Sequence, residues 1–126
     1  MYPGDIRYSK THQWARADGN IATIGITDYA QDQMGDLVYV ELPEVGNEIS
    51  EGDVIGSIES VKAVSDLNVP VSGTIIEVNE ALPDGPEKMN QSPYEEGWIA
   101  KIEMSDLSEL AQLLDADAYR EFVATL

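Results

Sequence analysis

Short stretches of alternating hydrophobic and polar residues recur along most of the chain. They lie at 13–17, 21–26, 37–43, 54–59, 64–69, 73–79 and 98–104. Alternation with a period of two over about six residues is typical of a β-strand with one buried face. The sequence therefore predicts a mainly β protein.

Turn-forming residues separate these strands. The Asp-Gly-Asn at 18–20 stands between two apolar-rich runs and predicts a hairpin, because its residues accept a positive φ. Further turns are predicted at 46–47 and 51–53, and the segment 81–94 is rich in Pro and Gly and predicts a long loop.

Helical patterns occur in two places. Thr27 is suited to cap a short helix near 27–34, and Gly35 supplies its left-handed stop. A C-terminal helical segment is predicted at about 105–124. It begins after Ser105 or Asp106, restarts at Asp115, and is expected to bury apolar positions. These positions are Leu107, Leu110, Leu113 and Leu114 in the first part and Ala118, Phe122 and Val123 in the second.

Length and charge restrict what the chain does. Its 126 residues correspond to one domain, 1–126, and its net charge of −17 repels nucleic acid and anionic lipid. The first ten residues lack a secretory or transit pattern, and no apolar run approaches the ~20 residues of a membrane span. We expect a cytoplasmic bacterial protein, mitochondrial only if this is a mature chain.

Candidate catalytic groups are few. The chain has one histidine, His12, no cysteine, and no nucleophile-elbow, Walker or dinucleotide-binding motif. We expect His12 to be a surface or structural residue, and we expect no metal site. Scattered carboxylates do not form an acid–base pair unless a cleft separates their pKa values. The pattern favours a non-catalytic carrier or a binding module.

Lys62 lies at the predicted tip of the hairpin formed by 54–59 and 64–69. Only four lysines occur among the seven basic residues, against 24 acidic ones. A tight β-turn presents a primary amine reproducibly to a modifying enzyme. The residues alone leave two interpretations open, a modification site or a charge that only keeps the hairpin soluble.

The frame E-G-D-x-x-G-x-x-E-x-x-K-A…P-V-S-G resembles lipoyl and biotinyl carrier domains, and ESVKAVSD resembles the H protein of the glycine cleavage system. THQW, ATIGITDYAQ, VELPEVG, VNEAL and SPYEEGW are also similar to H-protein signatures, from about residue 8 to 122. A biotin carrier would have Met-Lys-Met where this chain has Val-Lys-Ala. The resemblance implies a flattened β-sandwich of the barrel-sandwich hybrid type, with the lipoyl hairpin at about 53–70.

The resemblance also implies lipoic acid in amide linkage to Lys62, on an arm on the order of 14 Å long. In the family, this arm accepts the aminomethyl group of glycine at a pyridoxal-phosphate-dependent glycine decarboxylase. It delivers the group to a tetrahydrofolate-dependent aminomethyltransferase and is reoxidised by dihydrolipoamide dehydrogenase. A lipoate ligase or an octanoyl or lipoyl transferase attaches the cofactor.

Family members are thought to dock the loaded arm in a cleft on their own surface. By position, the resemblance assigns Thr11, Gln13 and Asp66 to this cleft, with Gln33 nearby. Most members resemble S/T-x-E-W, so Gln13 replaces a carboxylate and adds no charge to hold an ammonium. We expect Asp66 alone to supply the anion, and Glu59 to serve the lipoylating enzyme.

Two alternatives remain at this stage, and a third, slow catalysis by the isolated lipoylated protein, lacks the groups it would need in this sequence. The chain is an H-like lipoyl carrier, or lipoyl donor, for other lipoate-dependent complexes, or it is an unmodified β-sandwich whose acidic surface binds partners. The latter predicts a bare amine at Lys62.

Overall fold

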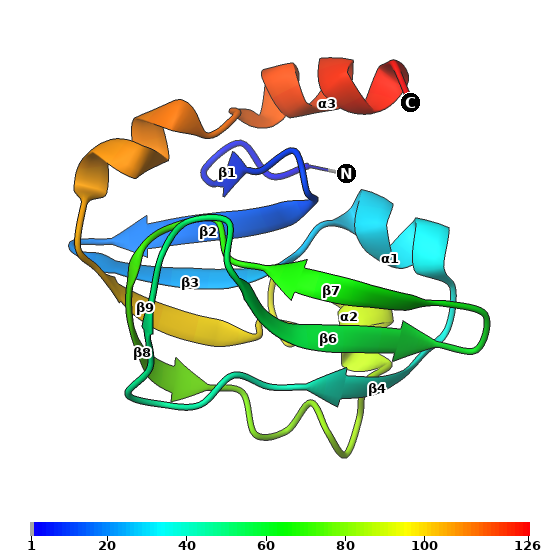
Figure 1. The fold of residues 1–126 in the computed structure, drawn as a ribbon. Helices are drawn as coiled ribbons and strands as arrows, with labels where there is room; N and C mark the ends of the chain where they lie inside the picture. Colours follow the sequence, from blue (N-terminus) through cyan, green and yellow to red (C-terminus); the bar gives the residue numbers. More distant parts are fainter. Residues whose placement is uncertain (1) are drawn as a thin grey trace.

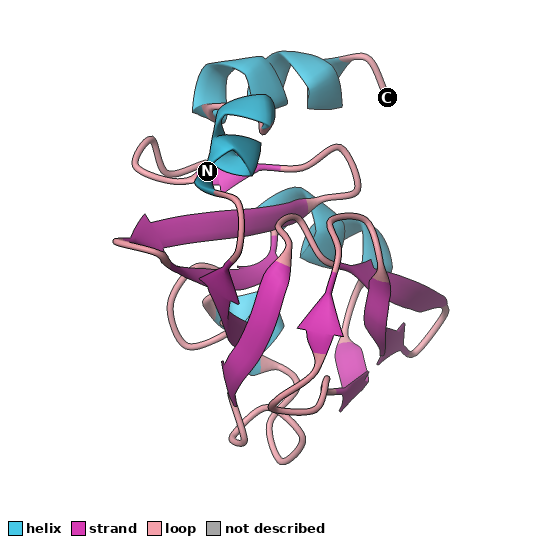
Figure 2. Ribbon diagram, turned by 60° about the vertical axis from the view of Figure 1, so that its left-hand side comes forward, coloured by secondary structure: helices cyan, strands magenta, loops and turns pink. Residues whose placement is uncertain are grey.

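Two antiparallel β-sheets form the framework of the computed structural model, which describes residues 2–126 (Figures 1 and 2). The six-stranded sheet has the order β1 (Arg7–Tyr8), β2 (Gln13–Asp18), β3 (Ile21–Ile26), β9 (Ala100–Met104), β8 (Gly73–Val78), β5 (Glu48–Ile49). The three-stranded sheet has the order β4 (Leu37–Glu41), β6 (Val54–Ser60), β7 (Val64–Asn68). The prediction of a mainly β flattened sandwich is confirmed.

In the described part of the chain, four short helices complete the fold: α1 (Asp28–Met34), α2 (Lys88–Gln91), the 3-10 helix η1 (Leu107–Gln112) and α3 (Ala116–Ala124). The caps predicted at Thr27 and Asp115 are present, since their side chains accept from the backbone N–H of Ala30 and Ala118. In residues 2–126, no helix is long and apolar enough to span a membrane.

Some elements differ from the sequence prediction. The two-residue strands β1 and β5 and the helix α2 were not predicted, because segments this short carry too little periodicity to be recognised. Segment 107–112 is a 3-10 helix, and Leu107, predicted to be inward, is 52% exposed. The tighter 3-10 turn moves successive side chains off the stripe that an α-helix would bury.

The main core lies between the two sheets. Ile24, Ile75 and Ile102 of the six-stranded sheet are fully buried, together with Leu67 of β7, while Ile58 of β6 is 2% exposed. Along β9, Ala100, Ile102 and Met104 are buried and alternate with Lys101 and Glu103, as a strand with one buried face requires.

A second hydrophobic cluster lies between the start of the six-stranded sheet and α3, which runs along β1 (Figure 1). Trp14 and Tyr119 are fully buried within it. Trp14 lies over its cross-strand partner Gly25, where an added Cβ would come within 2.7 Å of the indole ring. This cluster fixes the C-terminal helix against the β1–β2 loop.

Candidate functional site

Ser60 organises the tight turn that ends the β6–β7 hairpin. Its backbone N–H donates to the carbonyl of Ala63 at 2.8 Å, which closes the hairpin. Its hydroxyl oxygen accepts from the backbone N–H groups of Lys62 (3.3 Å) and Ala63 (3.1 Å), and the residue is only 5% exposed. Val61 and Lys62 are not among the positive-φ residues, so the turn is not of the primed types. The serine side chain instead gives the turn a defined shape with Lys62 at its tip.

The turn is anchored to the connection between α1 and β4. The backbone N–H of Val61 donates to the carbonyl of Asp36 at 3.1 Å. That connection is itself held by Asn90 of α2, whose amide donates to the carbonyl of Gly35 at 2.9 Å. A Cβ at Gly35 would lie 3.5 Å from Cε of Lys62, so the lysine stem lies beside this glycine. The hairpin tip therefore has a fixed place relative to α1.

The amine of Lys62 is available for chemistry. Within residues 2–126, Lys62 is exposed and forms no salt bridge or cation–π contact. By contrast, Lys101 forms a salt bridge with Glu77 at 3.8 Å. Lys10 lies over the ring of Phe122, with Nζ 5.7 Å from the ring centroid.

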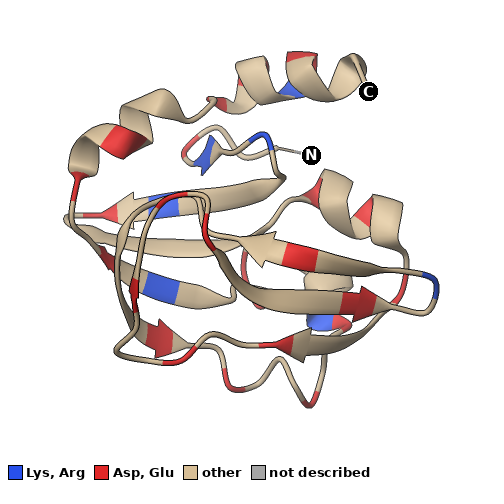
Figure 3. Cartoon of the chain, viewed as in Figure 1, with Lys and Arg blue, Asp and Glu red and all other residues tan. Residues whose placement is uncertain are grey.

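Glu59 lies on the outer face of the three-stranded sheet, away from the cleft described below. Its cross-strand partners are Tyr39 on β4 and Val64 on β7. Tyr39 is 52% exposed and Val64 is 68% exposed, and Glu59 is also exposed. Lys and Arg are absent from β4, β6 and β7, so the hairpin is acidic except at its turn (Figure 3). Glu59 is thus accessible to an approaching enzyme.

A cleft of about 180 Å³ brings together the other predicted residues. Thr11, Gln13, Gln33 and Asp66 all line it, from the β1–β2 loop, the start of β2, α1 and β7. Apolar surface comes from Ile26, Tyr29, Ala30, Met34 and Ile58, and His12 and Ser65 complete the lining.

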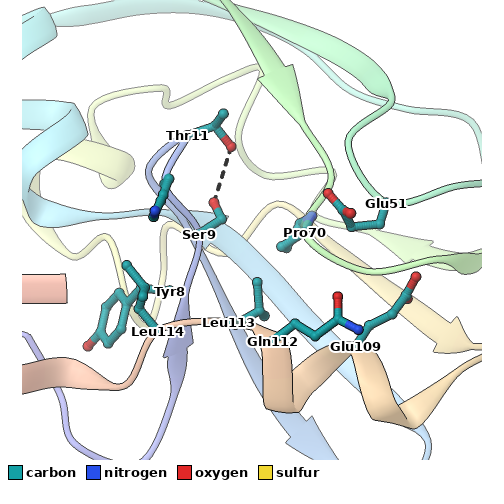
Figure 4. A pocket seen from close by; sticks show the side chains of 10 residues that line it. Tyr8, Ser9, Thr11, Glu51, Pro70, Glu109, Gln112, Leu113 and Leu114 are labelled. Carbon is teal, nitrogen blue, oxygen red and sulfur yellow. Dashed lines mark hydrogen bonds between the residues drawn. The ribbon is translucent and has the colours of Figure 1, made fainter. Parts of the chain in front are cut away.

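A larger groove of about 240 Å³ lies between the β1–β2 loop, η1 and the start of the hairpin (Figure 4). Thr11 borders both hollows, but Gln13 and Asp66 do not line the larger one. Glu109, which lines the larger groove, already accepts from the backbone N–H and hydroxyl of Ser72. The smaller cleft is therefore the candidate site, because it contains the polar residues next to the hairpin.

Gln13 braces the loop that forms one wall of the cleft. It is 3% exposed, and its side-chain oxygen accepts from the hydroxyls of Ser9 (2.9 Å) and Thr11. Its side-chain nitrogen donates to the backbone carbonyl of Thr11 at 2.7 Å. Both lone pairs of the amide oxygen are thus used within the loop. Gln13 shapes the cleft but has no acceptor left for a bound amine.

Asp66 lies on β7 at the free edge of the three-stranded sheet. The carbonyl of Ala63 accepts from the N–H of Ser60, and the N–H and C=O of Val69 bond to Asp53 and Gly52 on the β6 side. Because these directions alternate along an antiparallel strand, the N–H and C=O of Asp66 point away from β6. The Asp66 carbonyl accepts from the hydroxyl of Ser65 at 3.3 Å, which agrees with this direction. Asp66 therefore offers the cleft its main-chain carbonyl. Its side chain lies on the same face of the sheet as those of Val64 and Glu59, so its carboxylate reaches the cleft only around the edge strand β7.

His12 occupies a left-handed backbone conformation at the corner of the same loop, with φ 73°. Its Nδ1 lies 2.7 Å from the hydroxyl of Tyr119 on α3, and its ring packs 4.7 Å from that of Tyr29. Burial lowers the pKa of His12 below its ordinary value. The expectation of a structural histidine agrees with this packing. Tyr119 was not singled out from the sequence, because its contacts to the loop depend on how α3 packs.

Comparisons with known proteins agree on one family. The family model described as "Glycine cleavage H-protein" matches residues 6–126. Curated relatives called glycine cleavage system H protein, from Staphylococcus haemolyticus and Staphylococcus epidermidis, are each 56% identical over 121 residues, covering 96% of both chains. A solved glycine cleavage system H protein from Mycobacterium marinum superposes with a TM-score of 0.86 at 39% identity, covering 98% of this chain and 97% of that one.

Proposed function

The chain belongs to the glycine cleavage H-protein family, whose members are non-catalytic lipoyl carriers, and from this premise we propose that Lys62 is its lipoyl attachment site. The observation that supports this most is the turn itself. Ser60 and the Asp36 carbonyl hold the tip of the hairpin, where Lys62 is exposed and, within residues 2–126, forms no salt bridge.

The geometry of the hairpin fits a lipoyl arm. Asp66 of β7 lies four residues after Lys62, which corresponds to at most about 13 Å at ~3.3 Å per residue. An extended arm is on the order of 14 Å long, so its end reaches the cleft from the lysine. The apolar lining from Tyr29 and Met34 suits a hydrocarbon chain and a dithiolane ring.

Lipoic acid, when attached, supplies the disulfide and dithiol chemistry that carries the aminomethyl group of glycine. The protein's own residues position and shelter that group. Thr11 and the loop braced by Gln13 form one wall of the cleft, and α1 forms the other. The chain has no cysteine, so it cannot capture the cofactor as a mixed disulfide.

We propose the partners that this role requires. They are the pyridoxal-phosphate-dependent glycine decarboxylase, the folate-dependent aminomethyltransferase and dihydrolipoamide dehydrogenase, with a lipoate ligase or an octanoyl or lipoyl transferase attaching the cofactor. We assign Glu59 to recognition by the attaching enzyme, because it is exposed on the strand that leads to the turn. We place these partners and this chain in the bacterial cytoplasm.

Lysine substitutions test the attachment site. Lipoate-free wild type, Lys62→Arg and Lys10→Arg are incubated with a lipoate ligase, lipoate and ATP, and then with a glycine decarboxylase and glycine. We expect Lys62→Arg to gain no lipoyl mass and to support no carbon dioxide release. The matched control Lys10→Arg, which alters another exposed lysine, should behave as wild type. Full lipoylation of Lys62→Arg would refute the assignment.

We further propose that the Asp66 carboxylate is the anion that holds the amine of the cargo. Asp66→Asn keeps the main-chain carbonyl and removes the charge, so it should speed loss of the aminomethyl group. Asp36→Asn is the control, because Asp36 is exposed near the turn but does not line the cleft. An unchanged rate in Asp66→Asn would contradict the proposal and leave the carbonyl as the acceptor.

A further inference from the structure

The hydroxyl of Tyr119 connects two walls of the cleft from behind. It lies 2.7 Å from Nδ1 of His12 in the β1–β2 loop and 2.8 Å from Oγ1 of Thr27. Thr27 in turn caps α1, since its oxygen accepts from the backbone N–H of Ala30 at 3.2 Å. Tyr119 and Thr27 are both fully buried. A single hydroxyl on the C-terminal helix therefore bridges the loop and the start of α1.

The direction of these hydrogen bonds follows from the donors present. The backbone N–H of Ala30 is a fixed donor to Thr27, so the Thr27 hydroxyl hydrogen needs an acceptor elsewhere. Among the described contacts of that side chain, Tyr119 is the acceptor within reach. The Tyr119 hydroxyl hydrogen then points to Nδ1 of His12. This assignment places the imidazole proton on Nε2.

We propose that Tyr119 is a positioning residue whose hydroxyl ties His12 to Thr27 and thereby holds the cleft in the shape that protects the aminomethyl cargo. The proposal rests on the proposed function, because it concerns the same cleft. Tyr119 itself does not line the cleft, whereas His12 does. Its effect on the cargo is therefore indirect, through the positions of the loop and α1.

The surroundings of Tyr119 support this role. Its ring stacks on that of Tyr8, with centroids 4.8 Å apart, so the hydroxyl has little freedom to move. Burial raises the pKa of Tyr119 and lowers that of His12, which keeps both groups neutral and preserves the hydrogen bond between them. The other rings that pack on His12 are Tyr29 of α1 and Phe122 of α3.

The rate of cargo loss measures the protection. In water, the sulfur–carbon bond of the loaded arm is hydrolysed: the protonated aminomethyl group and one water give formaldehyde and ammonium, and the sulfur gains a proton and becomes a thiol. No oxidant or reductant is consumed. Lipoylated protein is loaded from glycine by a glycine decarboxylase and then separated from that enzyme. The rate of cargo loss is measured as the rate at which formaldehyde appears.

Tyr119→Phe removes the hydroxyl and keeps the ring. We expect cargo loss about three- to tenfold faster than in wild type, since two buried hydrogen bonds to the cleft walls are broken. Tyr8→Phe is the matched control. It is an equally buried tyrosine in the same stack, but its hydroxyl donates to the carbonyl of Pro3, away from the cleft. It should leave the rate within about twofold of wild type.

A second readout does not depend on the cargo. His12 is the one histidine in the chain, so its imidazole gives a single set of NMR signals. In wild type, nitrogen chemical shifts should show the Nε2–H tautomer. Tyr119→Phe should shift the His12 Nδ1 resonance and change the pH at which His12 titrates, whereas Tyr8→Phe should change neither.

The outcomes separate the positioning role of Tyr119 from the carrier role of the protein. Equal cargo loss in Tyr119→Phe and Tyr8→Phe, or an Nδ1–H tautomer in wild type, would overturn the proposal. If wild type protects its cargo no better than a loaded lipoyl-lysine peptide, cleft protection itself fails, while attachment at Lys62 stands. If Tyr119→Phe does not fold, His12→Asn replaces it. Asparagine tolerates the left-handed conformation and lacks the imidazole, and it should speed cargo loss similarly.

Discussion

Replacing Gln13 with Glu tests the hydrogen bonding that shapes the cleft. Gln13 is 3% exposed, and its side-chain nitrogen donates to the carbonyl of Thr11 at 2.7 Å. An ionised glutamate has no hydrogen there, so two oxygens would face each other in a buried place. The hydroxyls of Ser9 and Thr11 still donate to the other side-chain oxygen.

The size of the effect follows from these bonds. A buried carbonyl that loses its donor costs about 1–3 kcal/mol. The two hydroxyl bonds become stronger when their acceptor is charged, which offsets part of this cost. We expect a net loss of about 2 kcal/mol in the free energy of unfolding at pH 8, or a Tm lower by roughly 6–10 °C for a chain of this size.

The loss of stability in Gln13→Glu should become smaller as the pH falls. Burial raises the pKa of the introduced carboxyl above its unfolded value of about 4.3. The folded variant then binds more protons than the unfolded one, so its stability increases as the pH falls. The protonated acid also donates to the carbonyl of Thr11, as the amide does. The Tm deficit should therefore shrink between about pH 8 and pH 5.

The Tm deficit is measured by thermal unfolding of the lipoate-free protein, monitored by circular dichroism at pH 8 and pH 5. Gln33→Glu is the matched control, because Gln33 lines the same cleft and undergoes the same change of charge but is exposed. It should melt within about 2 °C of wild type at both pH values. If Gln13→Glu melts together with Gln33→Glu, the hydrogen bonds assigned to Gln13 do not contribute as described.

The same substitution should improve retention of the cargo. A carboxylate about 4 Å from an ammonium gains at most about 4 kcal/mol at an effective dielectric constant of 20. Even a third of this gain slows loss of the aminomethyl group about tenfold. Unchanged retention in lipoylated Gln13→Glu would show that residue 13 does not lie beside the amine.

Two further substitutions test the anchoring of the hairpin. Ser60→Ala removes the hydroxyl that accepts two backbone N–H groups of the turn, and should lower stability by about 1–2 kcal/mol in denaturant unfolding and slow lipoylation. Ser57→Ala, which removes a hydroxyl further along β6, should cost under about 0.5 kcal/mol, and equal losses would contradict the role of Ser60. Asn90→Ala removes the hydrogen bond that supports the α1–β4 connection. Because the N–H of Val61 bonds to that connection, its hydrogen exchange should become faster. Unchanged exchange would mean that the turn keeps its position without Asn90.

The sequence predicted the fold where local patterns were strong. Alternation over about six residues located the long strands, and the caps at Thr27 and Asp115 located two helices. Strands β1 and β5 are two residues long, and they form only because a neighbouring strand supplies their hydrogen bonds. Such elements depend on tertiary packing and leave no periodic signal.

The site was predicted by similarity more than by pattern. Lys62 stands out as a lysine in an acidic hairpin, but Thr11, Gln13 and Asp66 are distant in sequence and meet only through the packing of the two sheets. The roles of Ser60 and Asn90 depend on single hydrogen bonds whose partners cannot be known before the backbone is placed. In the sequence, Tyr119 likewise cannot be distinguished from any other aromatic residue of an amphipathic helix.

The central claim is that Lys62 carries a lipoyl group in the cell, and mass spectrometry of the protein isolated from its native source tests it most directly. We predict an intact mass increased by one lipoyl amide, mapped to the peptide that contains Lys62. Its two sulfurs should react with an alkylating reagent only after reduction, and no other group in this cysteine-free chain can do so. An unmodified Lys62, in cells whose other lipoyl proteins are fully loaded, would contradict the account.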